Sequence, residues 1–180
     1  MKHTPSLLAV LTVLATAPAV SAALVMNLSQ QGPDVVLVAS GSIDLTGMSF
    51  FSSSASAAAF MYPSSGILLT SGAYDLYLTG ADSAPSFGAG TSSSGSNNGG
   101  AAMGMWGGAV VVPAGYTSGT LMSNTSLFPG TTLAALGADI GGYGLTLNNG
   151  DTISLNVVPE ASSALLGLAG AGLLLRRRRN

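Results

Sequence analysis

The stretch Leu145–Val158, LTLNNGDTISLNVV, decides the fold class of this 180-residue chain. Alternating apolar and polar residues stand on both sides of Asn148-Asn149-Gly150-Asp151, and an Asn-Gly step between such runs is a strong hairpin signal. After the step, Ile153, Leu155 and Val157 share one face, because successive side chains of a strand point to opposite sides of a sheet. The stretch therefore predicts two antiparallel strands joined by a turn.

Strand-like patterns recur upstream of this hairpin. Asp34–Thr46, DVVLVASGSIDLT, opens with an apolar run and continues to alternate through Ile43 and Leu45. Shorter apolar or alternating runs occupy Ile67–Thr70, Tyr74–Thr79 and Ala109–Val112, and the last run stops at Pro113, which cannot donate to a ladder. Short strands separated by Gly and Pro predict a mainly β fold, an antiparallel β-sandwich or jelly-roll-like exported domain over residues 23–157.

Three segments of this domain do not have a strand pattern. Thr131–Gly137 predicts one helical turn with a threonine cap and a glycine stop. The alanine-rich stretch Ser54–Phe60 is interpreted as either helix or loop. Residues 83–102, SAPSFGAGTSSSGSNNGGAA, are of low complexity and carry no charge, so they predict a flexible surface loop.

The charge distribution excludes several classes of function. Only 7% of the residues are charged, against about 25% in an average soluble domain. Between Ala23 and Pro159 there are six aspartates and no Lys, Arg or His, a formal charge of −6. Such a body should repel nucleic acid, so no nucleic-acid partner is expected. The chain has no cysteine, which excludes disulfides and thiolate chemistry.

The N-terminus, MKHTPSLLAVLTVLATAPAVSAALV, has the pattern of a secretory signal peptide. Lys2 precedes the apolar run 7–17, Pro18 ends that run, and Val20 and Ala22 place small or aliphatic residues at the −3 and −1 positions of a cleavage site. Residues 1–22 are therefore expected to form a signal-peptide helix that directs the chain to the export translocon. Signal peptidase would then cut the chain between Ala22 and Ala23. A buried N-terminal helix is the alternative.

The C-terminus combines an apolar run with a basic end. Residues 161–175 would form a helix about 22 Å long, while the hydrocarbon core of a bilayer is about 30 Å thick. They are expected to form a short transmembrane helix. The positions of Arg176, Arg177, Arg178 and Arg179 predict a membrane stop on the cytoplasmic side.

Val158-Pro159-Glu160, the apolar run and the arginines together resemble the PEP-CTERM sorting signal of bacterial exported proteins, here spanning residues 158–180. The resemblance implies recognition by exosortase, a membrane-embedded cysteine protease that cuts near the motif and passes the body to the cell surface or extracellular matrix. The chain departs from the family pattern at Ala161, which stands where a second proline is usual. No Leu-Pro-x-Thr-Gly string of a sortase signal is present.

The body itself resembles a recurring exported domain that carries the same C-terminal signal. The resemblance lies in VVLVASGSIDLTG (35–47), YDLYLTG (74–80), VVVPAGYTSGT (110–120) and TTLAALG (131–137). It implies a β-rich exported domain, and it carries no established activity over to this chain.

Few residues of the body suggest catalysis. A Ser-His-Asp arrangement is excluded, because no histidine follows His3. Asp75 with Asp82, or Asp34 with Asp44, would suit glycoside hydrolysis if folding brought either pair together, and solvated surface aspartates are the alternative. Oxygen ligands for calcium gather at Asn148, Asn149 and Asp151, although hairpin chemistry is the preferred interpretation of that cluster. No metal or cofactor is expected.

Trp106, in MGMWGGAVVV (103–112), is expected to fill the core at the start of a strand. The alternative is stacking on a sugar, with Tyr74, Tyr77 and Tyr116 as further candidates. The sequence thus favours a non-enzymatic cell-surface or matrix protein, with exopolysaccharide as a candidate partner. A secreted carbohydrate-binding or adhesive module is the second hypothesis, and an aspartate-dependent hydrolase is the third.

Overall fold

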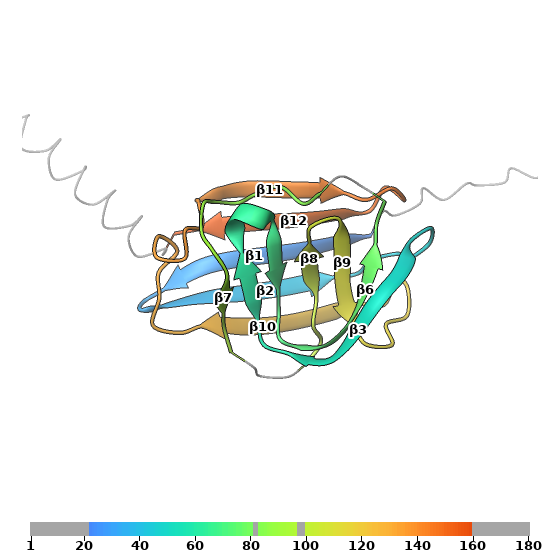
Figure 1. Ribbon diagram of the computed structural model, residues 1–180, viewed down its shortest axis with the longest axis horizontal. Helices are drawn as coiled ribbons and strands as arrows, with labels where there is room; N and C mark the ends of the chain where they lie inside the picture. The colour runs from blue at the N-terminus through green and yellow to red at the C-terminus, as the bar shows by residue number, and fades with distance from the viewer. Residues whose placement is uncertain (1–21, 81–82, 97–99, 160–180) are drawn as a thin grey trace, which may run out of the picture.

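The computed structural model describes residues 22–80, 83–96 and 100–159, which form two β-sheets (Figure 1). The first sheet has five strands in the order β10-β2-β1-β12-β11. Their bounds are β1 Ala23–Gln31, β2 Asp34–Gly41, β10 Met122–Phe128, β11 Gly141–Thr146 and β12 Thr152–Val158.

The second sheet has seven strands in the order β3-β6-β9-β8-β5-β4-β7 and lies in front of the first in Figure 1. Its strands are β3 Ser49–Ala57, β4 Phe60–Tyr62, β5 Ile67–Leu69, β6 Gly72–Leu78, β7 Ser93–Ser94, β8 Gly104–Trp106 and β9 Ala109–Pro113. Within the described residues the only helix is one 3₁₀ turn, η1, at Pro63–Ser65.

The prediction of a mainly β fold is confirmed, and nearly all strand pairs are antiparallel. The exception is β1 with β12, which run parallel from the pair Ala23 and Thr152 to the pair Ser29 and Val158. Because β1 begins where β12 begins, Ala22 and Pro159 lie at opposite ends of this sheet.

The hairpin predicted at residues 145–158 is confirmed. β11 and β12 pair antiparallel, with Thr146 opposite Thr152. The Leu147 N–H donates to the Asp151 carbonyl at 2.8 Å, and the Gly150 N–H donates to the Leu147 carbonyl at 2.9 Å. Only Gly150 of this turn has a positive φ, 91°, so the turn is wider than a two-residue type I′ turn, which needs two such residues.

The main core lies between the two sheets. Alternate residues of β1, Leu24, Met26 and Leu28, are fully buried against the second sheet's inward residues, among them Met105 and Val110. This alternation is the pattern expected of a sheet with one face on the core.

A second, smaller apolar cluster lies on the outer face of the seven-stranded sheet. It consists of Leu69, Leu76, Ala102, Ala109 and Val111. Strand β9 therefore buries both of its faces, which explains the unbroken apolar run AVVV in the sequence.

Two predictions of local structure are wrong. Ser54–Phe60, expected to be helix or loop, is mostly strand: β3 runs to Ala57 and β4 begins at Phe60, with only two residues between them. Pairing with β6 overrides the helix preference of the alanines here. The alternation after Gly41 is not strand either: β2 ends there, and Ile43 enters the core from a loop.

The prediction of a surface loop at residues 83–102 holds only in part: most described residues of the segment are irregular and exposed or half-buried, but it also contains β7 and several core side chains. Phe87 is 0% exposed, and Ala84 and Ala102 are buried. Gly88 forms a bridge with Ala138, so this segment packs on the residues that follow the 131–137 turn.

The predicted turn at Thr131–Gly137 is confirmed. The Leu136 N–H donates to the Thr132 carbonyl at 2.9 Å, and the Ala135 N–H donates to the Thr132 hydroxyl at 3.1 Å. Gly137 has φ 64°, as a left-handed stop requires.

The predictions for the two ends fall mostly outside the described residues. The signal-peptide helix, Glu160, the 161–175 helix and Arg176–Arg179 belong to residues 1–21 and 160–180. In the ranges that the structure describes, no helix is long and apolar enough to cross a membrane.

Candidate functional site

Trp106 lies on the outer face of the seven-stranded sheet and not in the core as expected. In β8 the preceding residue, Met105, points into the main core, so Trp106 points the other way. Its side chain is 38% exposed. The strand alternation therefore places the chain's single tryptophan at the surface.

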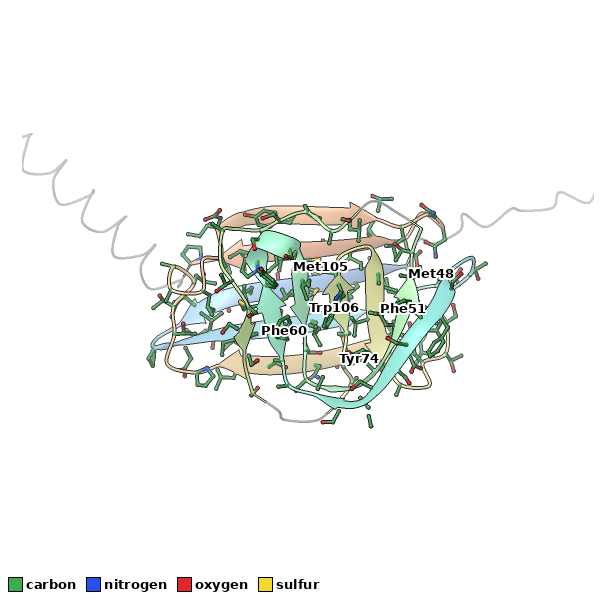
Figure 2. The ribbon with its side chains drawn as sticks, viewed as in Figure 1. Met48, Phe51, Phe60, Tyr74, Met105 and Trp106 are labelled. Carbon is green, nitrogen blue, oxygen red and sulfur yellow. The ribbon has the colours of Figure 1, made fainter. Side chains whose placement is uncertain are left out.

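Phe60 of β4 stacks on Trp106. The two ring centroids are 5.9 Å apart and the ring planes differ by 17°. Strand β5 lies between β4 and β8, with Leu69 opposite Phe60 and Ile67 opposite Trp106. The Phe60 and Trp106 side chains therefore reach toward each other across β5, and their rings meet above it. Figure 2 shows both rings with Tyr74 on the face turned to the viewer.

These aromatic residues border a shallow pocket of about 320 Å³, here called the Trp106 pocket. Its lining residues are Ser54, Ser56, Ala57, Ala58, Phe60, Leu69, Tyr74, Ser94 and Trp106. None of the nine carries a charge, and four carry hydroxyl groups. An apolar surface with a few hydroxyls suits a neutral ligand that has both apolar and hydroxylated faces.

Of the three tyrosines proposed to stack on sugar, only Tyr74 lies in the Trp106 pocket. Tyr77 packs against the main core, and its ring meets Phe50 edge-on at 5.7 Å and 76°. The hydroxyl oxygen of Tyr116 accepts the Ile43 N–H at 3.0 Å and lies 2.7 Å from the Thr120 carbonyl, to which it donates. Tyr116 therefore holds two loops together.

Of the two aspartate pairs considered for hydrolysis, Asp34 and Asp44 are not brought together. Asp34, at the start of β2, accepts the Gly130 N–H at 2.7 Å, whereas Asp44 lies beyond the opposite end of that strand. Asp75 accepts the Gly115 N–H at 2.8 Å. Its suggested partner, Asp82, lies outside the described residues.

Two of the three proposed calcium ligands, Asp151 and Asn149, are engaged in hydrogen bonds of the fold. Asp151 is 4% exposed, and its two carboxylate oxygens accept the N–H groups of Ala22 at 2.9 Å and Asp44 at 2.6 Å. The Asn149 side chain donates to the Asp44 carbonyl and accepts the Asp151 N–H. Residues 22–80, 83–96 and 100–159 contain no group of three His, Cys, Asp or Glu that could hold a metal ion.

Two groups of this region have shifted pKa values. A hydrogen bond from the Ser118 hydroxyl, with further bonds from Thr46, holds the pKa of Asp44 below its ordinary value of 3.8. Burial raises the pKa of Tyr116 above its ordinary value of 10.0, and the charges of Asp151 and Asp44 act in the same direction. The hydrogen bond with the Ile43 backbone opposes this rise.

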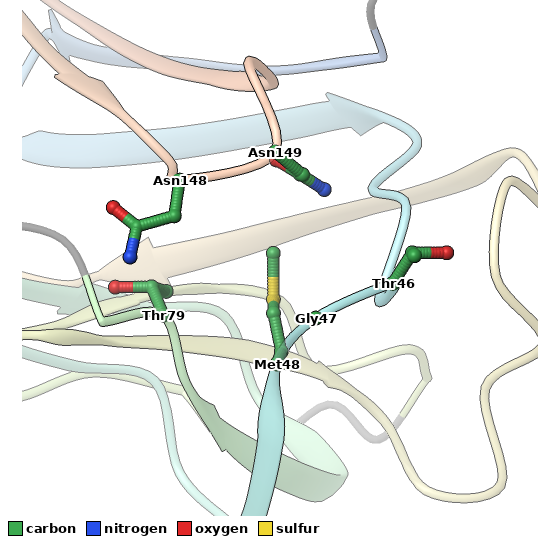
Figure 3. Close-up of a pocket in the computed structure, with 6 residues that line it drawn as sticks. All are labelled: Thr46, Gly47, Met48, Thr79, Asn148 and Asn149. Carbon is green, nitrogen blue, oxygen red and sulfur yellow. The ribbon is translucent and has the colours of Figure 1, made fainter.

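A second pocket, of about 270 Å³, lies beside these loops. It is lined by Thr46, Gly47, Met48, Thr79, Asn148 and Asn149. The Met48 side chain rises from the start of β3 toward the Asn148–Asn149 turn (Figure 3). Of the proposed calcium ligands, this pocket thus holds the two asparagines but not Asp151.

The described parts of the sorting and cleavage sites lie at the two ends of the first sheet. Val158, the last residue of β12, is exposed, and Pro159 follows it at the surface. Ala22 joins the fold through two hydrogen bonds, because its N–H binds Asp151 and its carbonyl accepts the Thr152 N–H at 3.2 Å.

Sequence reasoning missed Phe60 as a partner of Trp106. Its signal is the alternation in Phe60-Met61-Tyr62, where a buried Met61 turns the aromatic residues outward. No protein-family model, no curated protein and no solved structure matches this chain.

Proposed function

We propose that this chain is an exported, non-enzymatic protein of the bacterial cell surface or extracellular matrix, with a jelly-roll-like β-sandwich as its exported domain. The N-terminal leader directs the chain to the export translocon and to signal peptidase. Residues 158–180 form the sorting signal, in which an exosortase-like protease recognises Val158-Pro159-Glu160. The transmembrane helix 161–175 and Arg176–Arg179 hold the chain in the membrane until processing.

The observation that carries this proposal is the use of the aspartates as anchors for the backbone. Asp34, Asp44, Asp75 and Asp151 each accept at least one backbone N–H group. A carboxylate committed to such bonds stabilises loops and is poorly placed to exchange protons with a substrate. The body has no Lys, Arg, His or Cys to supply another acid, base or nucleophile. This pattern supports a binding or structural role.

The test is the intact mass of the protein from its native host, measured separately in the cytoplasmic, membrane and medium fractions. A species without the leader that ends near Pro159, in the medium or at the surface, supports the proposal. A leaderless membrane species that retains Arg176–Arg179 contradicts exosortase processing and leaves export intact. Full-length protein confined to the cytoplasm contradicts the whole proposal.

The Trp106 pocket favours a second function, the binding of a neutral carbohydrate such as exopolysaccharide. The C–H face of a sugar ring is apolar and packs on aromatic rings, which Trp106, Phe60 and Tyr74 present. The hydroxyls of Ser56 and Ser94 lie at the border, where they can bind the sugar's hydroxyl groups, whereas the Ser54 hydroxyl donates to the Ser56 carbonyl at 3.0 Å. The absence of charge from the lining favours a neutral ligand over an acidic one.

A glycan array and binding to the host's purified exopolysaccharide test this second function. We expect Trp106→Ala to weaken binding about tenfold or more, since buried aromatic contacts dominate many interfaces. Phe51→Ala is the matched control, because Phe51 is 62% exposed on β3 and does not line the pocket. Equal loss in both variants, or no binding by the unaltered protein, contradicts carbohydrate binding in this pocket.

A further inference from the structure

The Asp151 carboxylate is the most deeply buried acidic group among the described residues, and it ties three segments together. It lies just before β12, and its oxygens accept N–H groups from Ala22, before β1, and from Asp44, after β2. The Asp151 N–H in turn binds the Asn149 side chain at 3.0 Å. The carboxylate therefore fixes the start of the first sheet against two loops.

This buried carboxylate has hydrogen bonds but no cationic partner within the domain. The chain's basic residues are Lys2, His3 and Arg176–Arg179, so residues 22–159 contain none. Buried charges in proteins are usually paired, because removing a lone charge from water is costly. The nearest nitrogen that can become cationic is the Ala22 backbone nitrogen, 2.9 Å from Asp151 Oδ1.

That nitrogen becomes an ammonium only if the mature chain begins at Ala22. A cut between Ala22 and Ala23 would remove the Ala22 N–H donor and the Ala22 carbonyl, which accepts the Thr152 N–H. A cut one bond earlier keeps both hydrogen bonds and adds a positive charge at the nitrogen that already contacts Asp151.

The leader sequence accommodates either cut. Val20 and Ala22 occupy the −3 and −1 positions for the later bond, and Ala19 and Ser21 occupy them for the earlier bond. Both pairs place small or aliphatic residues at these positions, as signal peptidase prefers. The later bond, between Ala22 and Ala23, is the one expected above from the sequence, but the contacts of Ala22 favour the earlier bond.

We propose that signal peptidase cuts the Ser21–Ala22 bond and that the new α-ammonium group of Ala22 forms a partly buried ion pair with Asp151. This inference rests on the proposed export of the protein. Hydrolysis of the peptide bond by water leaves a carboxylate on Ser21 and the amine on Ala22, which is protonated at neutral pH. Removal of the leader then supplies the only cation of the domain at the place where its most buried carboxylate lies.

Mapping the N-terminus of the exported protein by mass spectrometry tests the cleavage site. A start at Ala22 is the expected result. A start at Ala23 overturns the inference and leaves the proposed export intact. A leader retained on all of the protein overturns both, so the two failures are distinguishable.

The ion pair has a second test, because the mature chain contains no lysine and its α-amine is its only primary amine. We expect an amine-acylating reagent to modify the native protein about tenfold or more slowly than the urea-unfolded protein, read by intact mass. Asp151→Asn should remove most of this protection, and Asp139→Asn, which alters an exposed aspartate, should not. Equal acylation rates in native and unfolded protein overturn the ion pair without reliance on any variant.

Discussion

The backbone N–H of Asp44 donates to Oδ2 of Asp151 at 2.6 Å, although 107 residues separate the two in the chain. The same carboxylate accepts the Ala22 N–H. Asp151→Ala leaves both donors without their acceptor, and each unsatisfied buried donor costs about 1–3 kcal/mol. We expect the free energy of unfolding to fall by about 2–4 kcal/mol, measured by urea denaturation.

Asp139→Ala is the control for this prediction, because Asp139 is an exposed aspartate of the same domain. Its effect should stay within about 0.5 kcal/mol, as for most surface substitutions. Equal losses in the two variants would show that Asp151 does not hold the loops together.

Loss of the Tyr116 hydroxyl should also lower the free energy of unfolding. Tyr116→Phe removes the acceptor of the Ile43 N–H and the donor to the Thr120 carbonyl. We expect a loss of about 1–3 kcal/mol, again by urea denaturation. Tyr143→Phe, which removes an exposed hydrogen bond to the Asp139 carbonyl, should cost less than about 1 kcal/mol. The reverse order of the two losses would refute the role given to Tyr116.

Because the pKa of Tyr116 is raised, the stability of the folded protein should depend on pH in the alkaline range. The folded protein holds this proton more tightly than the unfolded chain, so the contribution to stability is complete below the unfolded pKa of about 10 and decreases above it. Spectrophotometric titration of the phenolate should find one tyrosine that titrates above 10.0 and is absent from Tyr116→Phe. A titration curve unchanged by that substitution would contradict the assignment.

Because the pKa of Asp44 is lowered, the stability of the folded protein should also depend on pH in the acid range, where it falls as the pH decreases. Its stabilising contribution is present above the unfolded pKa of about 3.9 and is lost as the pH falls through the lower folded value. Ser118→Ala removes the hydroxyl that donates to Asp44 at 2.6 Å, so the pKa of Asp44 should rise in an NMR titration. Ser123→Ala, at an exposed site on β10, should leave that pKa unchanged. An unaltered pKa in Ser118→Ala would contradict the stated cause.

Gly90 predicts a steric effect in the low-complexity segment. A Cβ at this position would lie 1.8 Å from the Leu136 carbonyl oxygen, which is backbone and cannot rotate away. Gly90→Ala should therefore reduce the free energy of unfolding by about 2 kcal/mol or more. Gly144→Ala is the control, since the nearest atom there is 4.0 Å from the added carbon, and it should be neutral or slightly stabilising. A Gly90→Ala protein as stable as the unaltered chain would exclude this close approach.

The hairpin at residues 145–158 and the 131–137 turn could be predicted because their signals are local. Each depends on a few adjacent residues whose hydrogen bonds close within the same segment. The core face of β12 followed from its alternation for the same reason. The parallel partner of β12 could not be predicted, since β1 lies more than a hundred residues away and alternation does not encode strand direction.

The segment 83–102 shows why composition can mislead. Glycine and serine are typical of flexible loops, yet glycine is equally required where two backbones approach closely. Gly88 and Gly90 are such positions, because the backbone of residues 136–137 lies too close for a Cβ at either one. Phe87, which directly precedes them, supplies a core side chain. A single aromatic residue in an otherwise small and polar segment was the available signal.

The candidate pocket was only partly predictable. Trp106 and Tyr74 were among the stacking candidates, but their shared face depends on the order β6-β9-β8-β5-β4 in the second sheet. That order also brings Phe60 to Trp106. A sequence without a known pairing pattern does not determine which aromatic residues share a face.

The parallel pairing of β1 with β12 also determines how the domain responds to mechanical force. A pull between Ala22 and Pro159 acts along both strands in opposite directions, because these residues lie at opposite ends of the ladder. All seven residue pairs of the ladder then bear the load together in shear. If the terminal strands were antiparallel neighbours, the same pull would separate their hydrogen bonds one after another. A domain pulled at these two ends would therefore resist stretching through its first and last strands.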